Sequence, residues 1–314
     1  MIMEINKAAE FLKNHDNYLI LTHSHPDGDT LGSAGALCHA LRRCGKCAYL
    51  YRNPEITKKF VEYVGEYLAP EGFVSDTIIS TDVPDPDLFP VGFDGKVDLA
   101  FDHHPTNSHF ASELVLGSDK ASCGEIITQA VKQLCGDIDK TEADLLYMAV
   151  STDTGCFMYA NTKADTFITA AELVKAGAAL PEINKKMFRT FSRARLELEG
   201  YVFTHFRSFR NGTINVAVIP YEVTESTGIT ENDCDDIASL AGRLEGSLVN
   251  ITVRETSPGN CKISVRSGKE LDSAALCRVF GGGGHVMAAG CRIKCGCDEA
   301  VARVVAEAQK ALDA

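Results

Sequence analysis

One stretch decides how the first half of this chain folds, and it reads Tyr18-Leu-Ile-Leu-Thr-His23-Ser-His-Pro-Asp27-Gly-Asp29. Its first five residues form a short apolar run, which predicts a buried β-strand over 18–22. The Asp-rich turn that follows leads into residues 30–43, whose Ala, Leu and Gly content predicts a helix. A strand that passes through a polar turn into a helix is the building unit of α/β folds.

The same alternation of strand and helix continues to about residue 176. Apolar patterns predict further strands at 47–51, 77–81 and 97–101, and helices at 122–135, 142–152 and 163–176. We therefore expect an α/β fold whose N-terminal domain has a mostly parallel sheet flanked by helices. The carboxyl ends of parallel strands lie at one edge of the sheet, where binding sites form.

The composition changes after a segment rich in Arg and aromatic residues near residue 200. Beyond it the pattern mixes strands and helices, with a hairpin expected around Pro258 and an amphipathic helix at 300–312. The 314 residues are enough for two hydrophobic cores. We expect a catalytic domain at 1–190, a connector at 191–210 and a smaller C-terminal α/β domain with a mixed sheet at 211–314.

The chain carries 31 Lys and Arg residues against 43 Asp and Glu residues, a formal net charge of −12. This acidic balance argues against binding to long duplex nucleic acid but does not exclude short nucleotides. No apolar run approaches the roughly 18 residues that a membrane span needs, and the N-terminus lacks the pattern of a secretory signal. We therefore expect a cytoplasmic protein without membrane partners. The twelve cysteines agree with a reducing compartment, and free thiols are favoured over structural zinc.

Carboxylate and imidazole side chains follow apolar runs in four stretches that are far apart in the sequence. Both kinds of side chain suit Mn, Mg or Zn, and an Asp that bridges two such ions is typical of two-metal hydrolytic sites. Taken singly, each motif has a structural explanation, such as a solvated Asp-Gly-Asp turn or a buried His pair. Four such explanations at once are harder to sustain than one metal site. The candidate ligands are His23, Asp27, Asp29, Asp82, His103 and Asp153.

A second candidate site lies near the end of the chain, where four glycines precede a histidine. Consecutive glycines expose backbone N–H groups to a phosphate, and a helix of small residues is expected after them. A flexible loop is the structural alternative. Arg266 could clamp a phosphate or stack on a base, or else pair with nearby acidic residues. The candidate substrate-binding residues are Arg266, Gly282, Gly283, Gly284 and His285.

In their order and spacing, these motifs resemble the DHH phosphoesterase superfamily with its DHH-associated C-terminal domain. The motifs are His23-Ser-His-Pro-Asp27-Gly-Asp29, Asp82, Asp102-His103-His104, Ser151-Thr-Asp153-Thr-Gly155 and Gly281-Gly-Gly-Gly-His285. Within the superfamily, the chain length and the lack of extra domains look most like the stand-alone nanoRNase/pAp-phosphatase proteins. The resemblance implies hydrolysis of short oligoribonucleotides (nanoRNA) and of 3′-phosphoadenosine 5′-phosphate (pAp).

Other interpretations of the same resemblance stay open. Phosphodiesterases of cyclic di-AMP or of the linear dinucleotides pApA and pGpG have the same build. Family II inorganic pyrophosphatases share the N-terminal motifs but not the glycine run. A nucleotide-binding or metal-sensing protein of this fold is the non-enzymatic alternative, and the retention of every candidate ligand argues against it. A homodimer is compatible with the resemblance by analogy alone.

The resemblance also implies a pair of divalent metal ions, usually manganese, with magnesium as the alternative. By motif, the ligands divide into His23 and Asp27 for one ion, Asp29 and His103 for the other, and Asp82 and Asp153 completing or bridging both.

Two further positions are implied in catalysis. His104 would face the scissile phosphate, and Asp102 would orient an imidazole. The chain departs from the pattern at two places. His25 stands where many relatives have Asn, and it could add a ligand or a substrate contact. Residues 83–95 contain no basic residue where many relatives have Arg, which leaves the preferred substrate open.

Overall fold

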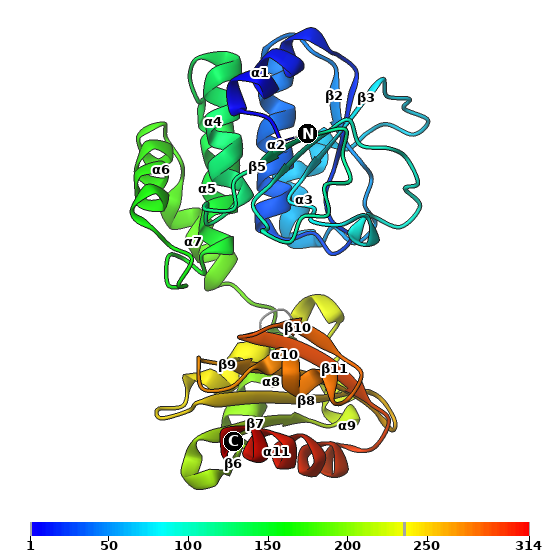
Figure 1. Ribbon diagram of the computed structural model, residues 1–314, viewed down its shortest axis with the longest axis vertical. Helices are drawn as coiled ribbons and strands as arrows, with labels where there is room; N and C mark the ends of the chain where they lie inside the picture. Colours follow the sequence, from blue (N-terminus) through cyan, green and yellow to red (C-terminus); the bar gives the residue numbers. More distant parts are fainter. Residues whose placement is uncertain (1, 235–236, 314) are drawn as a thin grey trace. The chain divides into compact units, whose positions relative to one another are not determined.

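The computed structural model describes residues 2–234 and 237–313, and the chain divides into two units. The first unit spans Met1–Thr190 and the second spans Phe191–Ala314 (Figure 1). Each unit has its own sheet and its own hydrophobic core. No helix in the described residues combines the length and the apolar character that crossing a membrane requires.

The first unit is built around a five-stranded sheet in the order β2-β1-β3-β4-β5, and every neighbouring pair of strands is parallel. The strands are β1 Tyr18–Leu21, β2 Ala48–Leu50, β3 Thr77–Thr81, β4 Leu99–Asp102 and β5 Glu113–Leu116. Strand β1 has β2 on one side and β3 on the other, so the order of the strands reverses there. In open α/β sheets, ligands bind outside the carboxyl ends of the strands at such a reversal.

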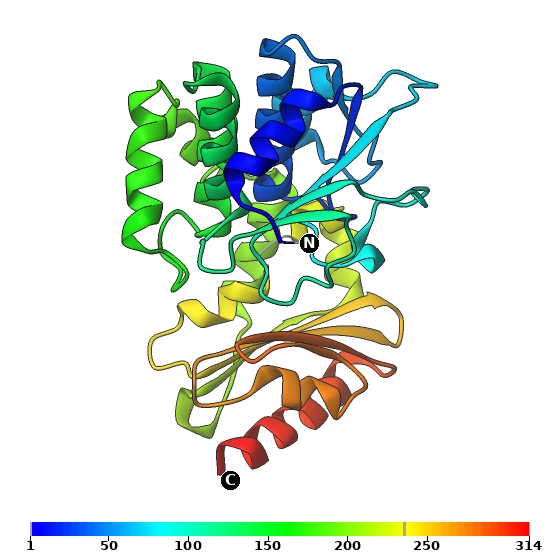
Figure 2. The same ribbon diagram turned by 45° about the horizontal axis from the view of Figure 1, so that its top comes forward.

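Helices cover one face of this sheet, and loops cover the other. In the described residues of the first unit the helices are α1 Ile5–Asn14, α2 Gly28–Arg43, α3 Lys58–Val64, α4 Cys123–Cys135, α5 Lys140–Asp153, α6 Ala164–Lys175 and α7 Leu180–Phe188, with 3-10 helices at Gly65–Tyr67 and Pro86–Leu88. Helices α2, α4 and α5 pack against one another beside the sheet (Figures 1 and 2). Along β1, Tyr18 and Ile20 enter the core shared with these helices. Leu21 faces the other side, where Phe89 and Phe110 from loops pack.

The ends of these helices follow from the local sequence. Ser122 caps α4 because its side chain accepts a hydrogen bond from the N–H of Glu125. Gly136, with φ 88°, ends the same helix in the left-handed conformation that glycine adopts without a steric cost. Asp139 and Glu142 form a capping box at the start of α5.

Glycines allow α2 and α5 to approach each other backbone to backbone. A Cβ atom on Gly32 would lie 2.3 Å from the carbonyl oxygen of Leu145, and one on Gly28 would lie 2.4 Å from Oγ1 of Thr152. Real side chains are not tolerated at such distances, so both positions depend on glycine. The close approach places the start of α2 beside the end of α5.

We predict that Gly32→Ala lowers the free energy of unfolding by about 1–3 kcal/mol, because the added methyl group overpacks the contact between α2 and α5. Urea denaturation followed by circular dichroism measures the change. The matched control is Gly200→Ala in helix α8 of the second unit, where an added Cβ meets nothing within 4 Å. That exchange should leave stability unchanged or raise it by up to about 1 kcal/mol. Equal stability of the two variants would contradict the tight helix contact.

The second unit contains a six-stranded mixed sheet in the order β10-β11-β9-β8-β7-β6 (Figure 1). Its strands are β6 Arg207–Phe209, β7 Ile214–Ile219, β8 Val249–Ser257, β9 Asn260–Ser267, β10 Gly283–His285 and β11 Ala288–Ile293. Strands β7 and β8 run parallel, and the other neighbours run antiparallel. The described helices are α8 Arg193–Thr204, α9 Tyr221–Thr227, α10 Ser273–Arg278 and α11 Cys297–Asp313, with 3-10 helices at Arg210–Gly212, Glu231–Cys234 and Ile237–Arg243.

Strand β7 is buried on both faces of this sheet. Val216 and Val218 pack in the core that includes Val304 of α11. Ala217 joins a separate cluster with Leu198 of α8 on the other face. The alternation follows from the two-residue period of a strand.

The predicted fold class is confirmed, since a five-stranded parallel sheet and a separate six-stranded mixed sheet are both present. The hairpin expected around Pro258 is formed by β8 and β9. Strand β5, Glu113–Leu116, was not predicted; its short apolar run forms a strand by pairing with β4. The helix of small residues expected after the glycine run is wrong: Ala288–Ile293 is strand β11. Pairing with β9 over six residues outweighs the weak local preference of this segment.

Candidate metal centre

The first unit brings six predicted ligands from four separate stretches to the carboxyl edge of its sheet. His23 follows β1, Asp82 follows β3 and His103 follows β4. The other three belong to helix ends: Asp27 caps α2, Asp29 lies in the first turn of α2, and Asp153 is the last residue of α5. This edge is where the order of the strands reverses, so topology and chemistry indicate the same place.

Asp29 is buried, with 1% of its surface exposed, and the start of helix α4 holds its carboxylate. The N–H of Cys123 donates to Oδ2 at 2.7 Å, and the N–H of Gly124 donates to Oδ1 at 2.9 Å. The positive end of the α4 dipole adds to this stabilisation of a negative charge. Burial, together with repulsion from Asp82 and Asp153, nevertheless raises the pKa of Asp29 well above its usual value.

Asp82 combines a rare backbone conformation with an unsatisfied carboxylate. Its φ is 61°, which a non-glycine residue seldom adopts, and only 3% of its surface is exposed. Among the described residues, its Oδ1 atom finds no hydrogen-bond donor. Burial, followed by the negative charge of Asp27, raises the pKa of Asp82 well above its usual value. Strain and an orphaned buried oxygen at one residue are typical of functional sites.

His103 directs one ring nitrogen at three carboxylates. Its Nδ1 lies 3.3 Å from the carbonyl oxygen of Lys120, which can only accept, so Nδ1 carries the hydrogen of a neutral ring. Its Nε2 then lies 3.4 Å from Asp82, 3.7 Å from Asp153 and 3.8 Å from Asp29. These separations are long for hydrogen bonds but fit ligands that share a cation about 2.1 Å from each. A backbone acceptor that fixes the tautomer is typical of metal-binding histidines.

Three groups of possible ligands contain Asp82 or adjoin it, and in each group one atom from every residue lies within 4.8 Å of the others. The groups are His23, Asp27 and Asp82; Asp29, His103 and Asp153; and Asp82, His103 and His104. Asp82 reaches the first two groups, because its Oδ2 lies 3.8 Å from Nε2 of His23 and its Oδ1 lies 3.4 Å from Nε2 of His103. Carboxylate and imidazole together suit hard or borderline divalent cations. The residues present therefore fit two ions with Asp82 between them.

His104 and Asp102 form a second, hydrogen-bonded pair beside the ligands. Oδ1 of Asp102 lies 2.8 Å from Nδ1 of His104, and Oδ2 accepts from Nδ2 of Asn107 at 2.6 Å. Although burial alone would raise it, these hydrogen bonds and the adjacent imidazole lower the pKa of Asp102. Asp102 is fully buried, whereas a third of the His104 side chain is exposed. Asp102 therefore occupies Nδ1 of His104, and Nε2 is the ring nitrogen that stays available to a ligand.

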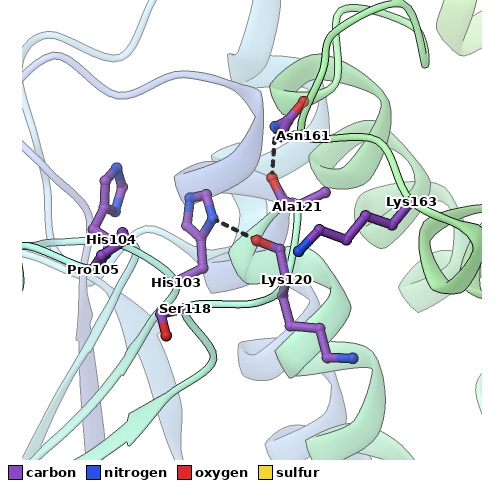
Figure 3. Close-up of a pocket in the computed structure, with 8 residues that line it drawn as sticks. All are labelled: His103, His104, Pro105, Ser118, Lys120, Ala121, Asn161 and Lys163. Carbon is purple, nitrogen blue, oxygen red and sulfur yellow. Dashed lines mark hydrogen bonds between the residues drawn. The ribbon is translucent and has the colours of Figure 1, made fainter. Parts of the chain in front are cut away.

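Both histidines line a pocket of about 250 Å³ that also includes Lys120, Asn161 and Lys163 (Figure 3). These three residues were not predicted from the sequence, because a loop Asn and scattered Lys residues form no pattern. Nδ2 of Asn161 donates to the carbonyl oxygens of Ala121 at 3.0 Å and Asp153 at 3.1 Å. Asn161 therefore fixes the end of α5 from which Asp153 extends.

A further cluster of possible ligands lies at the other ends of α2 and α5. It contains His39, Asp139 and Glu142. Arg43 already supplies the positive charge, since its NH1 atom lies 2.7 Å from Glu142. Nδ1 of His39 lies 2.9 Å from the Tyr67 hydroxyl, and its Nε2 lies 2.9 Å from Asp139. This cluster is an ion-pair network that fastens the two helices.

The candidate substrate-binding residues of the second unit lie on strands β9 and β10. His285 pairs with Ala288, and Ala288 pairs with Arg266, so the three side chains point to one face of the sheet. The small Ala288 between them leaves both polar side chains accessible from that face. His285 is exposed and Arg266 is partly exposed.

Two glycines of the run are required by strand packing. A Cβ on Gly282 would lie 2.2 Å from the carbonyl oxygen of Gly290, and one on Gly284 would lie 2.6 Å from that of Ala288. Gly283 meets nothing within 4 Å. The glycine run therefore has a structural role, because it lets β10 lie close against β11.

Comparison with known families agrees with this architecture. Residues 17–150 match the DHH family, N-terminal domain, and residues 212–314 match the DHHA1 domain. The chain is thus a two-domain phosphoesterase, a metal-dependent hydrolase that acts on nucleotides or oligonucleotides. It belongs to the DHH family, as the resemblance of its motifs predicted.

Its relatives include bifunctional oligoribonucleases and PAP phosphatases. The chain is 32% identical to the one named NrnA in Thermus thermophilus, over 94% of this chain and 88% of the relative. It is 25% identical to the one in Bacillus subtilis, over 89% of this chain and 90% of the relative. An exopolyphosphatase-related protein from Bacteroides fragilis shares the fold, with a TM-score of 0.86 at 21% identity, covering 98% of this chain and 95% of that one.

We predict that Asp82→Asn makes the protein more stable when metal is removed and nearly insensitive to metal when it is added. The amide keeps the shape of the side chain, removes one buried negative charge and tolerates the positive φ. In the presence of a chelator, the melting temperature should rise by roughly 2–4 °C for each kcal/mol gained. Differential scanning calorimetry with and without Mn²⁺ measures both effects.

The matched control is Asp94→Asn, an exposed carboxylate in a loop. It should follow the wild type in both conditions. A chelated Asp82→Asn protein that melts below the chelated wild type would show that the buried carboxylates do not repel one another.

Proposed function

We propose that this protein is a two-metal phosphoesterase that uses manganese to hydrolyse short oligoribonucleotides and to remove the 3′ phosphate of pAp. The observation that carries the proposal is Asp82, which has a strained backbone and an orphaned carboxylate oxygen and whose side chain reaches both His23 and His103. The names of the relatives in Thermus thermophilus and Bacillus subtilis support the two substrates. Manganese fits the mixed carboxylate and imidazole donors.

Six side chains would hold the ions. One position is formed by His23, Asp27 and Asp82, and the other by Asp29, His103 and Asp153, with Asp82 shared. When bound, the ions lower the pKa of a coordinated water and polarise the phosphoryl oxygens. The Lys120 carbonyl accepts from Nδ1 of His103, so Nε2 is the nitrogen that would bind an ion.

His104 would act on the substrate itself. Asp102 holds Nδ1 of its ring at 2.8 Å, so the other nitrogen faces the pocket that adjoins the ligands. In the protonated ring this nitrogen donates to an oxygen of the scissile phosphate and stabilises the charge that develops there.

In the second unit, Arg266 and His285 would bind the nucleotide through the face that they share. A guanidinium pairs with phosphate through two hydrogen bonds and stacks on bases. The exposed Gly283 adds a backbone position without a side chain.

The test is hydrolysis of a substrate panel by purified protein. With Mn²⁺, we expect pAp and short RNA oligomers to be hydrolysed faster than cyclic di-AMP, pApA, pGpG and pyrophosphate, and Mg²⁺ to support lower rates. Asp153→Ala should abolish hydrolysis of every substrate, because a ligand to an ion is lost. Faster turnover of cyclic di-AMP or of a linear dinucleotide would assign a different substrate class, and no hydrolysis at all would contradict the proposal.

We predict that Arg266→Ala lowers kcat/KM for pAp by about tenfold or more, because a charged hydrogen bond to the nucleotide is lost. Hydrolysis of bis-p-nitrophenyl phosphate, which lacks a nucleotide, should change less than about twofold. Steady-state kinetics on both substrates measures the difference. The matched control is Arg207→Ala on β6, at the opposite edge of the sheet from β10. Equal losses on both substrates would contradict a nucleotide-binding role.

A further inference from the structure

The pocket beside the DHH histidines contains a lysine that the proposed chemistry does not use. His103 and His104 line one part of it, and Lys163 lines another (Figure 3). Lys163 directly precedes helix α6. Its side chain extends toward the loop that carries the Lys120 carbonyl, the group that holds His103 (Figure 3). A cationic group therefore shares a pocket with the histidines expected at the scissile phosphate.

No carboxylate in the described part of the chain neutralises the charge of Lys163. Its Nζ donates to the carbonyl oxygen of Asp119 at 2.5 Å, which is a neutral acceptor. Among the residues that the structure describes, no carboxylate oxygen lies within 4.0 Å of this nitrogen. Lys120 differs, because its Nζ lies 3.4 Å from Asp165 and 3.6 Å from the Asp119 carboxylate. Of these two lysines in the pocket, Lys163 is the one available to an anion.

An anion bound by Lys163 would lie near the scissile phosphate without being it. In the proposed function, the scissile phosphate would be bound by the ions and by His104, a residue that lines the pocket and lies beside the ligand Asp82. We propose that Lys163 binds a second phosphate of the substrate, the one carried by the same ribose as the scissile phosphate. This inference rests on the proposed function and names the feature that the substrates share.

The two proposed substrates have this feature in common. A nucleoside 3′,5′-bisphosphate carries two phosphates on one ribose, and so does each 5′-phosphorylated nucleotide within an oligoribonucleotide. One cationic subsite beside the scissile position would serve both, because it recognises the spacing of two phosphates and not the base. A nucleoside 3′-monophosphate has the scissile phosphate alone and would gain nothing from Lys163. The position of the second phosphate thus becomes the criterion for a good substrate.

The experiment compares pAp with adenosine 3′-monophosphate, which differs only in the missing 5′ phosphate. Lys163→Gln should lower kcat/KM for pAp by about tenfold or more, mainly through KM, because one charge-assisted hydrogen bond is lost. The same variant should change kcat/KM for the monophosphate by less than about twofold. Lys163→Arg keeps the charge and should retain most of the activity on pAp.

The matched control is Lys7→Gln on the exposed surface of α1, which removes the same charge far from this pocket in sequence. It should leave both substrates unaffected, so that an effect of net charge is recognised. Equal losses on both substrates with Lys163→Gln would overturn the subsite, as would an unchanged preference for pAp.

A binding measurement separates this inference from the proposed function. If the wild type hydrolyses neither substrate, the proposed function fails, and the subsite is then judged by calorimetric titration with the same two nucleotides. Tighter binding of pAp than of the monophosphate, lost in Lys163→Gln, would support a second-phosphate site even without turnover. Equal affinity of wild type and variant for pAp would overturn it.

Discussion

Mutual repulsion among buried carboxylates is the constraint around which the first unit is organised. Asp29, Asp82 and Asp153 surround one nitrogen of His103 at 3.4–3.8 Å. Removing such charges from water is costly unless a cation or hydrogen-bond donors compensate. The start of helix α4 compensates Asp29 through two backbone N–H groups, whereas Oδ1 of Asp82 receives none among the described residues. Divalent ions would supply the positive charge that the remaining carboxylate oxygens lack.

The antiparallel pair of helices α2 and α5 holds two of these carboxylates in place. At one end, Asp29 in the first turn of α2 and Asp153 at the end of α5 reach the same nitrogen of His103. Glycines in α2 allow the axes of α2 and α5 to lie close together. At the far end, Arg43 of α2 pairs with Glu142 of α5. A pair fastened along its length keeps ligands within the few tenths of an ångström that metal coordination requires.

Chemistry and recognition fall to different groups in this protein. In the proposed function, the ligand cluster and the pair of His104 and Asp102 would act on any phosphate ester, since none of them reads a base or a sugar. Recognition in the first unit would then depend on Lys163, whose Nζ has no carboxylate partner among the described residues. In the second unit, Arg266 and His285 share a face of the mixed sheet. A phosphate-spacing criterion explains how one centre could accept both a bisphosphate and an oligomer.

The sequence by itself determined the two kinds of sheet and placed candidate ligands just past the ends of strands, because hydrophobic periodicity and turn residues are local properties. Strands β5 and β10 were not predicted, since short strands form through pairing with distant partners. The sequence indicated Asp82 and His103 as ligands by residue type. It did not show that Oδ1 of Asp82 lacks a donor or that Nδ1 of His103 faces the Lys120 carbonyl. Only the tertiary structure decided these, along with the free charge of Lys163, because burial and hydrogen-bond partners depend on which distant residues pack together.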